Sequence, residues 1–214
     1  MLPRSTPEMQ GIKSSGILQF IERGERTIDD LHSVMLLRHG RVIAEGWWAP
    51  YAEQTPHELY SLSKSFASTA VGIAIAESRL GLNDTVTSFF DQSDLPTEPS
   101  GNLRAMRIRD LLSMNSGHQD DTEYRLSVED GRWSRAFLHL NVEHKPGTHF
   151  VYNTGATYML STILQKTTGE RLIDYLRPRL FDKLGIKNPS WQQSPEGVDL
   201  GGWGLRITTE DIIR

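Results

Sequence analysis

The most constraining stretch of this chain is an apolar helical run over residues 61–79, which opens on Ser61 and Lys64. A helix that is apolar on nearly every side belongs inside a protein core. The sequence therefore predicts a buried central helix from Ser61 to about Arg79, with Gly81 as its C-terminal stop. The apolar side chains of the run are Phe66, Ala67, Ala70, Val71, Ile73, Ala74 and Ile75.

Ser61 and Lys64 are three residues apart, and this spacing places two side chains on one helix face with Cβ atoms about 5–6 Å apart. A serine hydroxyl becomes a good nucleophile when a nearby base, such as a lysine held neutral by burial, takes its proton. The N-terminus of a buried helix would also favour developing negative charge. The alternative is that Ser61 caps the helix and Lys64 is a solvated residue of the first turn. The spacing alone leaves both open.

Composition narrows the class of protein. With 214 residues, 37% hydrophobic and 23% charged, the chain is long enough for one good core and is typical of a globular protein. With a net charge of −4, the chain has neither the excess of basic residues typical of nucleic-acid binding nor a polybasic membrane patch. The absence of cysteine excludes disulfides, thiol catalysis and cysteine-ligated metals. Because no signal-peptide core or transmembrane run is present, we expect a cytoplasmic protein without nucleic-acid or membrane partners.

Local patterns predict a helix that follows a cap at residues 14–16 and runs to about Glu25. Strands are predicted over 33–38 and 41–47, and a two-residue turn, His39-Gly40, joins them into a hairpin. The acidic stretch 120–130 is predicted to be a surface segment, and residues 94–102 a loop. Further helices are predicted at 83–90, 108–114, 133–140, 155–166 and 171–184, the last broken at Pro178. Three histidines, His139, His144 and His149, are five residues apart and do not share a helix face, so no metal site is expected.

Several segments, in order along the chain, resemble the penicillin-recognising serine hydrolases, whose first motif is Ser-x-x-Lys. The resemblance is to the branch that holds class C β-lactamases, D-alanyl peptidases, β-lactamase-like esterases and 6-aminohexanoate-oligomer hydrolases. Besides Ser61-Leu62-Ser63-Lys64, the matching segments are Arg-His-Gly-Arg-Val (38–42), Leu-Leu-Ser-Met-Asn-Ser-Gly (111–117), Phe-Val-Tyr-Asn-Thr-Gly (150–155) and Gly-Gly-Trp-Gly-Leu (201–205) with Thr-Thr-Glu-Asp (208–211).

This resemblance implies an α/β fold: a β-lactamase-like sandwich of an antiparallel sheet with helices, plus a mostly helical lobe over about residues 84–150. Residues 1–214 would form a single hydrolase domain that is incomplete at its C-terminal end and holds only the N-terminal hairpin of the sheet. The family's third motif, a Lys/His-Thr/Ser-Gly-like segment on a strand that supplies an oxyanion donor, is not found after Tyr152. A second chain could supply the missing strands. We expect residues 1–214 alone to be unstable or non-catalytic.

The resemblance also implies a mechanism without a cofactor or metal. Ser61 would attack a small ester, amide or β-lactam, and Lys64 and Tyr152 would transfer protons. Whether lysine or tyrosine is the main base stays open. Taken without the family, Tyr152 is equally a buried aromatic residue whose hydroxyl is satisfied.

The second motif departs from the family pattern, which commonly reads Tyr-x-Asn where this chain reads Tyr152-Asn153-Thr154. Thr154 could donate one hydrogen bond to a substrate, and Asn153 is a second candidate for substrate binding. The departure favours an esterase or amidase. The alternatives are a β-lactamase or D-alanyl peptidase, or a non-catalytic, penicillin-binding-like ligand-binding or sensor domain.

Overall fold

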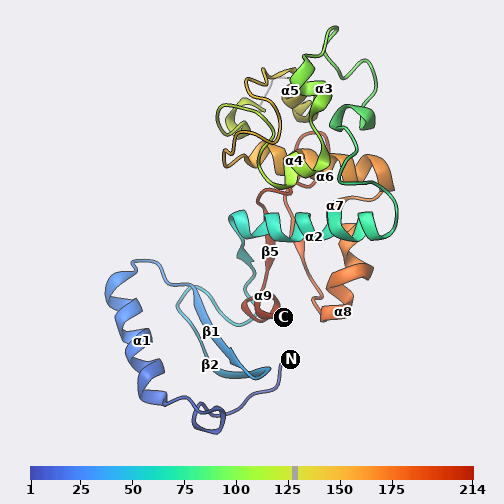
Figure 1. Ribbon diagram of the computed structural model, residues 1–214. Helices are drawn as coiled ribbons and strands as arrows, with labels where there is room; N and C mark the ends of the chain where they lie inside the picture. Colours follow the sequence, from blue (N-terminus) through green and yellow to red (C-terminus); the bar gives the residue numbers. More distant parts are fainter. Residues whose placement is uncertain (127–129) are drawn as a thin grey trace. The chain divides into compact units, whose positions relative to one another are not determined.

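A computed structural model describes residues 1–126 and 130–214 (Figure 1). They form two compact units. The first unit comprises Met1–His57, Leu184–Ile186 and Arg206–Arg214, and the second comprises Glu58–Lys183 and Lys187–Leu205.

The first unit contains a helix and a β-hairpin that the sequence predicted closely. Helix α1 spans Ser14–Thr27, and strands β1 (Ser33–Arg38) and β2 (Arg41–Trp47) have the predicted bounds and pair antiparallel. His39 and Gly40 have φ angles of 49° and 71°. Positive φ at both central residues is what the turn of a two-residue hairpin of this kind requires. The short 3₁₀ turn η1 (Glu8–Gln10) and helix α9 (Thr209–Ile213) complete the unit.

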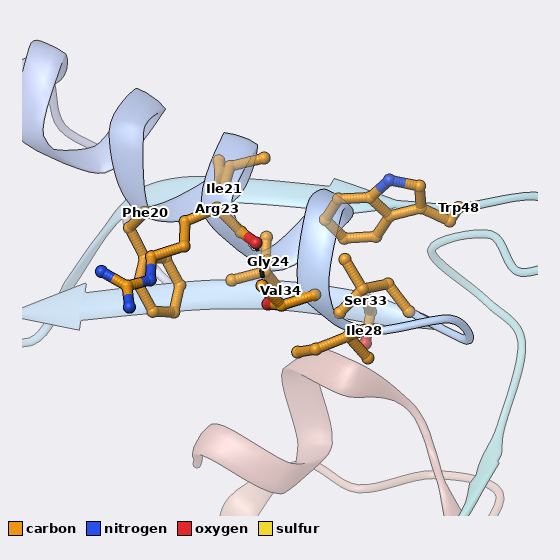
Figure 2. A pocket seen from close by; sticks show the side chains of 10 residues that line it. Phe20, Ile21, Arg23, Gly24, Ile28, Ser33, Val34 and Trp48 are labelled. Atoms are coloured by element: carbon orange, nitrogen blue, oxygen red, sulfur yellow. Dashed lines mark hydrogen bonds between the residues drawn. The ribbon is translucent and has the colours of Figure 1, made fainter.

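An apolar groove of about 330 Å³ lies along α1 in this unit (Figure 2). Phe20 and Ile21 line it from α1, Val34 from β1, and Trp48 from the residue after β2. Phe20 is still 61% exposed, so the groove covers only part of its ring.

The second unit is built around helices α2 (Ser63–Ala76) and α6 (Thr154–Thr168), which pack against each other. Every residue of α6 from 154 to 164 is buried, whereas α2 buries Ser63, Ala67, Ala70, Val71 and Ala74. The run was predicted to be a buried helix, and it is buried along one face only. Three of the four apolar residues on that face are alanine, whereas Phe66, Ile73 and Ile75 are only partly buried. Helix α6 is the more deeply buried of the two.

The ends of α2 also differ from the prediction. The regular helix begins at Ser63, because Tyr60–Leu62 form a separate 3₁₀ turn, η2. It ends at Ala76, and Ser78 takes the left-handed conformation with φ 56°, so the predicted stop at Gly81 was wrong. A serine in that conformation breaks the helix three residues before the glycine, although glycine is the usual residue there.

The remaining elements are short: β3 (His57–Glu58), η3 (Val86–Phe89), α3 (Gly101–Ala105), α4 (Ile108–Leu112), η4 (Glu123–Arg125), α5 (Trp133–His139), α7 (Leu172–Leu176), the π-helical η5 (Arg177–Phe181), α8 (Asp182–Leu184), β4 (Ser190–Trp191) and β5 (Leu205–Ile207). Helix α3 begins inside the predicted loop, where the Ser100 hydroxyl caps it by accepting from Leu103 N. Pro178 lies in η5, between α7 and α8, where a break was predicted.

Strands β3, β5 and β4 pair in that order, so the hairpin is not the only sheet in the described chain. The predicted fold class, helices with an antiparallel sheet, is confirmed. The predicted helical lobe over residues 84–150 stays a prediction. Part of it and part of the acidic stretch, residues 127–129, lie outside the described residues. Within residues 1–126 and 130–214, no helix combines the length and apolarity that crossing a bilayer demands.

Two helical glycines give a matched test of this packing. A Cβ at Gly155 in α6 would lie 2.0 Å from Thr122 Oγ1, whereas a Cβ at the exposed Gly72 in α2 meets nothing within 4 Å. We expect Gly155→Ala to lower the free energy of unfolding by about 1–3 kcal/mol through overpacking. Gly72→Ala should raise it by about 0.4–1 kcal/mol, because alanine restricts the unfolded chain. Urea unfolding measures both, and equal effects at the two positions would contradict the packing described.

Candidate active site

The turn that carries Ser61 is fixed by the backbone of Leu205, the first residue of β5. Leu59 N donates to Leu205 O at 2.9 Å, and Leu205 N donates to the buried Ser63 hydroxyl at 3.3 Å. Between these anchors, Tyr60 has a φ of 43°. A non-glycine residue in this left-handed region carries strain of order 1–3 kcal/mol, and such residues cluster at functional sites. Ser61 follows directly, in the 3₁₀ turn, with its side chain exposed.

The structure brings the two predicted residues of the first motif together. Lys64 Nζ donates to Ser61 Oγ at 3.2 Å and to the backbone oxygen of Gly202 at 2.9 Å. The glycine is needed for the close packing of Thr154, because a Cβ at position 202 would lie 2.7 Å from Thr154 Cγ2, whereas its 3.6 Å distance from Lys64 Nζ would be an ordinary contact. The lysine is thus held from one side by a backbone carbonyl while it contacts the serine hydroxyl on the other.

Tyr152 lies next to the same lysine. Lys64 Nζ is 4.9 Å from the centroid of its ring, within the range of a cation–π contact. The side chain is 48% exposed, unlike the buried aromatic residue of the alternative interpretation. The segment before it is held by the Leu-Leu-Ser-Met-Asn-Ser-Gly stretch, because Val151 N donates to Met114 O at 3.1 Å.

The structure places the two predicted substrate-binding residues, Thr154 and Asn153, in different surroundings. Thr154 borders the cleft, and its backbone N and Oγ1 donate to the two carboxylate oxygens of Asp121 at 2.8 and 2.9 Å. Asn153 is fully buried behind it. Its Oδ1 caps α6 by accepting from Ala156 N at 3.2 Å and also accepts from the Thr122 hydroxyl at 2.8 Å. A direct contact of Asn153 with a substrate stays a prediction, and this arrangement does not favour it.

A cleft of about 380 Å³ opens over the Ser61–Lys64 pair. Its lining residues are Glu58, Tyr60, Ser61, Lys64, Glu123, Thr154, Gly202 and Trp203. Sequence reasoning missed the cleft positions of Glu58 and Glu123. It placed Gly202 and Trp203 in a structural segment. The acidic stretch around Glu123 carried no pattern beyond polarity, so no sequence signal distinguished it from a solvated surface.

Glu123 sits at the start of η4, and its backbone N donates to Asp121 Oδ1 at 3.0 Å. Burial raises the pKa of the Glu123 carboxyl, and the neighbouring Asp121 charge raises it further. Lys64 and Thr154 act in the opposite direction. The carboxyl is thus electrostatically coupled to the lysine of the first motif.

A buried polar network lies behind α6. His118 is fully buried, and its Nδ1 is 3.0 Å from the Ser116 hydroxyl, which also accepts from Asn153 Nδ2 at 3.2 Å. His118 Nε2 has no hydrogen-bond partner among the described residues. Burial, with the nearby Arg125 charge, lowers the pKa of His118 to about 4, so the ring is neutral near pH 7.

The sequence matches the family model described as Beta-lactamase over residues 26–212. The chain belongs to the β-lactamase family. This confirms the resemblance found in the sequence motifs. Among curated proteins, Protein flp of Staphylococcus aureus strain MW2 is 24% identical over 175 residues, covering 76% of this chain and 35% of that protein.

Solved structures show the same fold. A Bacillus anthracis protein named as a 6-aminohexanoate-dimer hydrolase superposes with a TM-score of 0.76 at 19% identity, covering 90% of this chain and 54% of that one. EstCE1, named as a hydrolase with promiscuous acyltransferase activity, gives a TM-score of 0.75 at 20% identity over 93% of this chain and 70% of its own. The chain therefore spans about a third of the length of the flp protein and about half of the Bacillus protein.

The buried network predicts a specific acid sensitivity. The folded-state pKa of His118, about 4, lies below the ordinary value of 6.5, so the folded state binds fewer protons between these values. Its contribution to stability is present above pH 6.5 and is lost as the pH falls towards 4, by about 3 kcal/mol. We expect His118→Asn, which cannot protonate there, to flatten the pH dependence of the free energy of unfolding measured in urea. Parallel curves for the two proteins would contradict the assignment.

Proposed function

We propose that this chain is a serine hydrolase that cleaves an ester or amide through an acyl-enzyme on Ser61. The observation that carries the proposal is the Ser61–Lys64 contact of 3.2 Å on the wall of a cleft, in a member of the β-lactamase family. An exposed hydroxyl beside an amine that a backbone carbonyl holds in place is the arrangement that nucleophilic catalysis requires.

In the proposed reaction, neutral Lys64 accepts the Ser61 proton while Oγ attacks the carbonyl carbon. The resulting tetrahedral oxyanion lies near the start of α2, where backbone N–H groups favour negative charge. Lys64, or Tyr152 beside it, returns the proton to the leaving group as the carbon–leaving-group bond breaks. Water then gives a proton to the same base as it attacks the acyl carbon, the bond between that carbon and Ser61 Oγ breaks to release the acid, and the base returns the proton to Ser61.

The second motif supports an ester or amide substrate over a β-lactam. Thr154 borders the cleft and offers a hydroxyl that already donates to Asp121, while the Asn153 amide lies behind it. Among the described residues that line the cleft, none brings the side-chain amide that the family's Tyr-x-Asn pattern would present to a β-lactam. Two proteins of similar fold are named as a 6-aminohexanoate-dimer hydrolase and as a hydrolase with promiscuous acyltransferase activity.

The nucleophile is tested by covalent labelling of the 214-residue chain with a generic fluorophosphonate probe, followed by intact mass and peptide mapping. We expect one probe per chain, on Ser61. Ser61→Ala should abolish the adduct, and Ser65→Ala, which removes an exposed hydroxyl one turn along, should leave it unchanged. Lys64→Met should slow labelling by about a hundredfold or more, because the base is removed. No adduct on a chain shown to be folded by circular dichroism would refute the proposal.

Labelling needs a single attack of Ser61 on the phosphorus of the probe, with loss of fluoride, and so does not depend on complete turnover. Turnover tests the separate expectation that residues 1–214 without the third motif are non-catalytic.

Tyr152→Phe distinguishes the two candidate bases. If tyrosine is the main base, Tyr152→Phe should slow labelling as much as Lys64→Met does.

Substrate preference is tested with a short-chain p-nitrophenyl ester and a chromogenic cephalosporin. We expect the ester to acylate Ser61 faster, seen as a burst of nitrophenolate that Ser61→Ala lacks. A faster reaction with the cephalosporin would reverse the preference and support the β-lactamase alternative while leaving the nucleophile intact.

A further inference from the structure

The cleft contains a carboxylate that the proposed reaction does not use. Glu123 lines it together with Ser61 and Lys64, and η4 fixes its backbone through the bond from Glu123 N to Asp121. The neighbouring Asp121 is turned inward, where Thr154 N and Oγ1 occupy both of its oxygens. The Lys64 charge and a hydrogen bond with Thr154 both act on the Glu123 carboxyl, and each lowers its pKa.

The rest of the cleft suits a positive charge rather than a negative one. Among the described lining residues, Lys64 is the single cation, and its ammonium is held by Gly202 O and Ser61 Oγ. Tyr60, 69% exposed, and Trp203 contribute aromatic surfaces to the same lining. Aromatic faces beside a carboxylate are the surroundings that recognise organic ammonium groups.

We infer that Glu123 is a specificity-determining residue that selects esters or amides bearing an ammonium group near the scissile carbonyl. The inference rests on the proposed function, since it assigns the substrate class of the same cleft. Glu123 takes no part in the bond changes. It attracts the substrate cation through charge, and the aromatic rings accommodate the alkyl groups around that cation.

The partly buried position of Glu123 strengthens this effect. A charge pair at a protein surface of intermediate dielectric interacts several times more strongly than the same pair in bulk water. Glu123 is neither fully exposed nor fully buried. Its carboxylate therefore remains accessible to a ligand while water screens it less than it screens an exposed carboxylate.

The test compares two p-nitrophenyl esters of matched shape, one ending in a trimethylammonium group and the other in a tert-butyl group. The measured quantity is the ratio of their second-order rate constants for the nitrophenolate burst from the 214-residue chain. We expect the ratio to favour the cationic ester and to fall about tenfold in Glu123→Gln, as expected for a lost charge pair. Added salt should lower the wild-type ratio and leave that of Glu123→Gln nearly unchanged.

Glu98→Gln is the control, because it makes the same chemical change at an exposed carboxylate outside the cleft lining. It should keep the wild-type ratio. The neutral ester reports the fraction of active protein in each variant, so partial misfolding cancels in the ratio. A ratio unchanged in Glu123→Gln, with a normal burst from the neutral ester, overturns this inference and leaves the proposed function standing. No burst from either ester, with no probe adduct on Ser61, overturns both.

Discussion

The contact between Lys64 Nζ and the Gly202 carbonyl is the interaction on which the candidate site depends. It joins residues 138 positions apart and ties the start of α2 to the segment before β5. Position 202 has no side chain, and a Cβ there would lie only 2.7 Å from Thr154 Cγ2. One backbone oxygen thus sets where the amine lies relative to Ser61, and one glycine sets how closely α6 can approach them both.

A second layer of polar contacts holds the start of α6 in place. Because that end of the helix is buried, its free N–H groups need partners inside the protein. Asn153 supplies one by accepting from Ala156 N, and Asp121 supplies another by accepting from Thr154 N. The asparagine side chain therefore serves the helix, and the threonine after it borders the cleft. This division places a hydroxyl, rather than a side-chain amide, at the border of the cleft two residues after Tyr152.

Features encoded locally were predictable, and features that depend on distant contacts were not. The hairpin bounds followed from alternation around His39-Gly40, and the Ser61–Lys64 proximity followed from a spacing of three residues even though Ser61 lies in a 3₁₀ turn. The end of α2 was mispredicted because Ser78 adopts a conformation more usual for glycine. Gly202 and Glu123 reach the cleft through tertiary packing of segments far apart in sequence, and neither carries a pattern that reveals this.

The two proposals for this cleft meet at one pair of charges, Lys64 and Glu123. Burial and the Asp121 charge raise the pKa of the Glu123 carboxyl, and the Lys64 charge lowers it, so the two groups act on each other across the cleft. In the proposed reaction the lysine serves the Ser61 hydroxyl, which lies 3.2 Å from its Nζ. In the proposed selection the carboxylate attracts a second cation, which the substrate would bring. The two tasks would thus be divided between two side chains, because the amine would act at the scissile bond and the carboxylate on the group beside it.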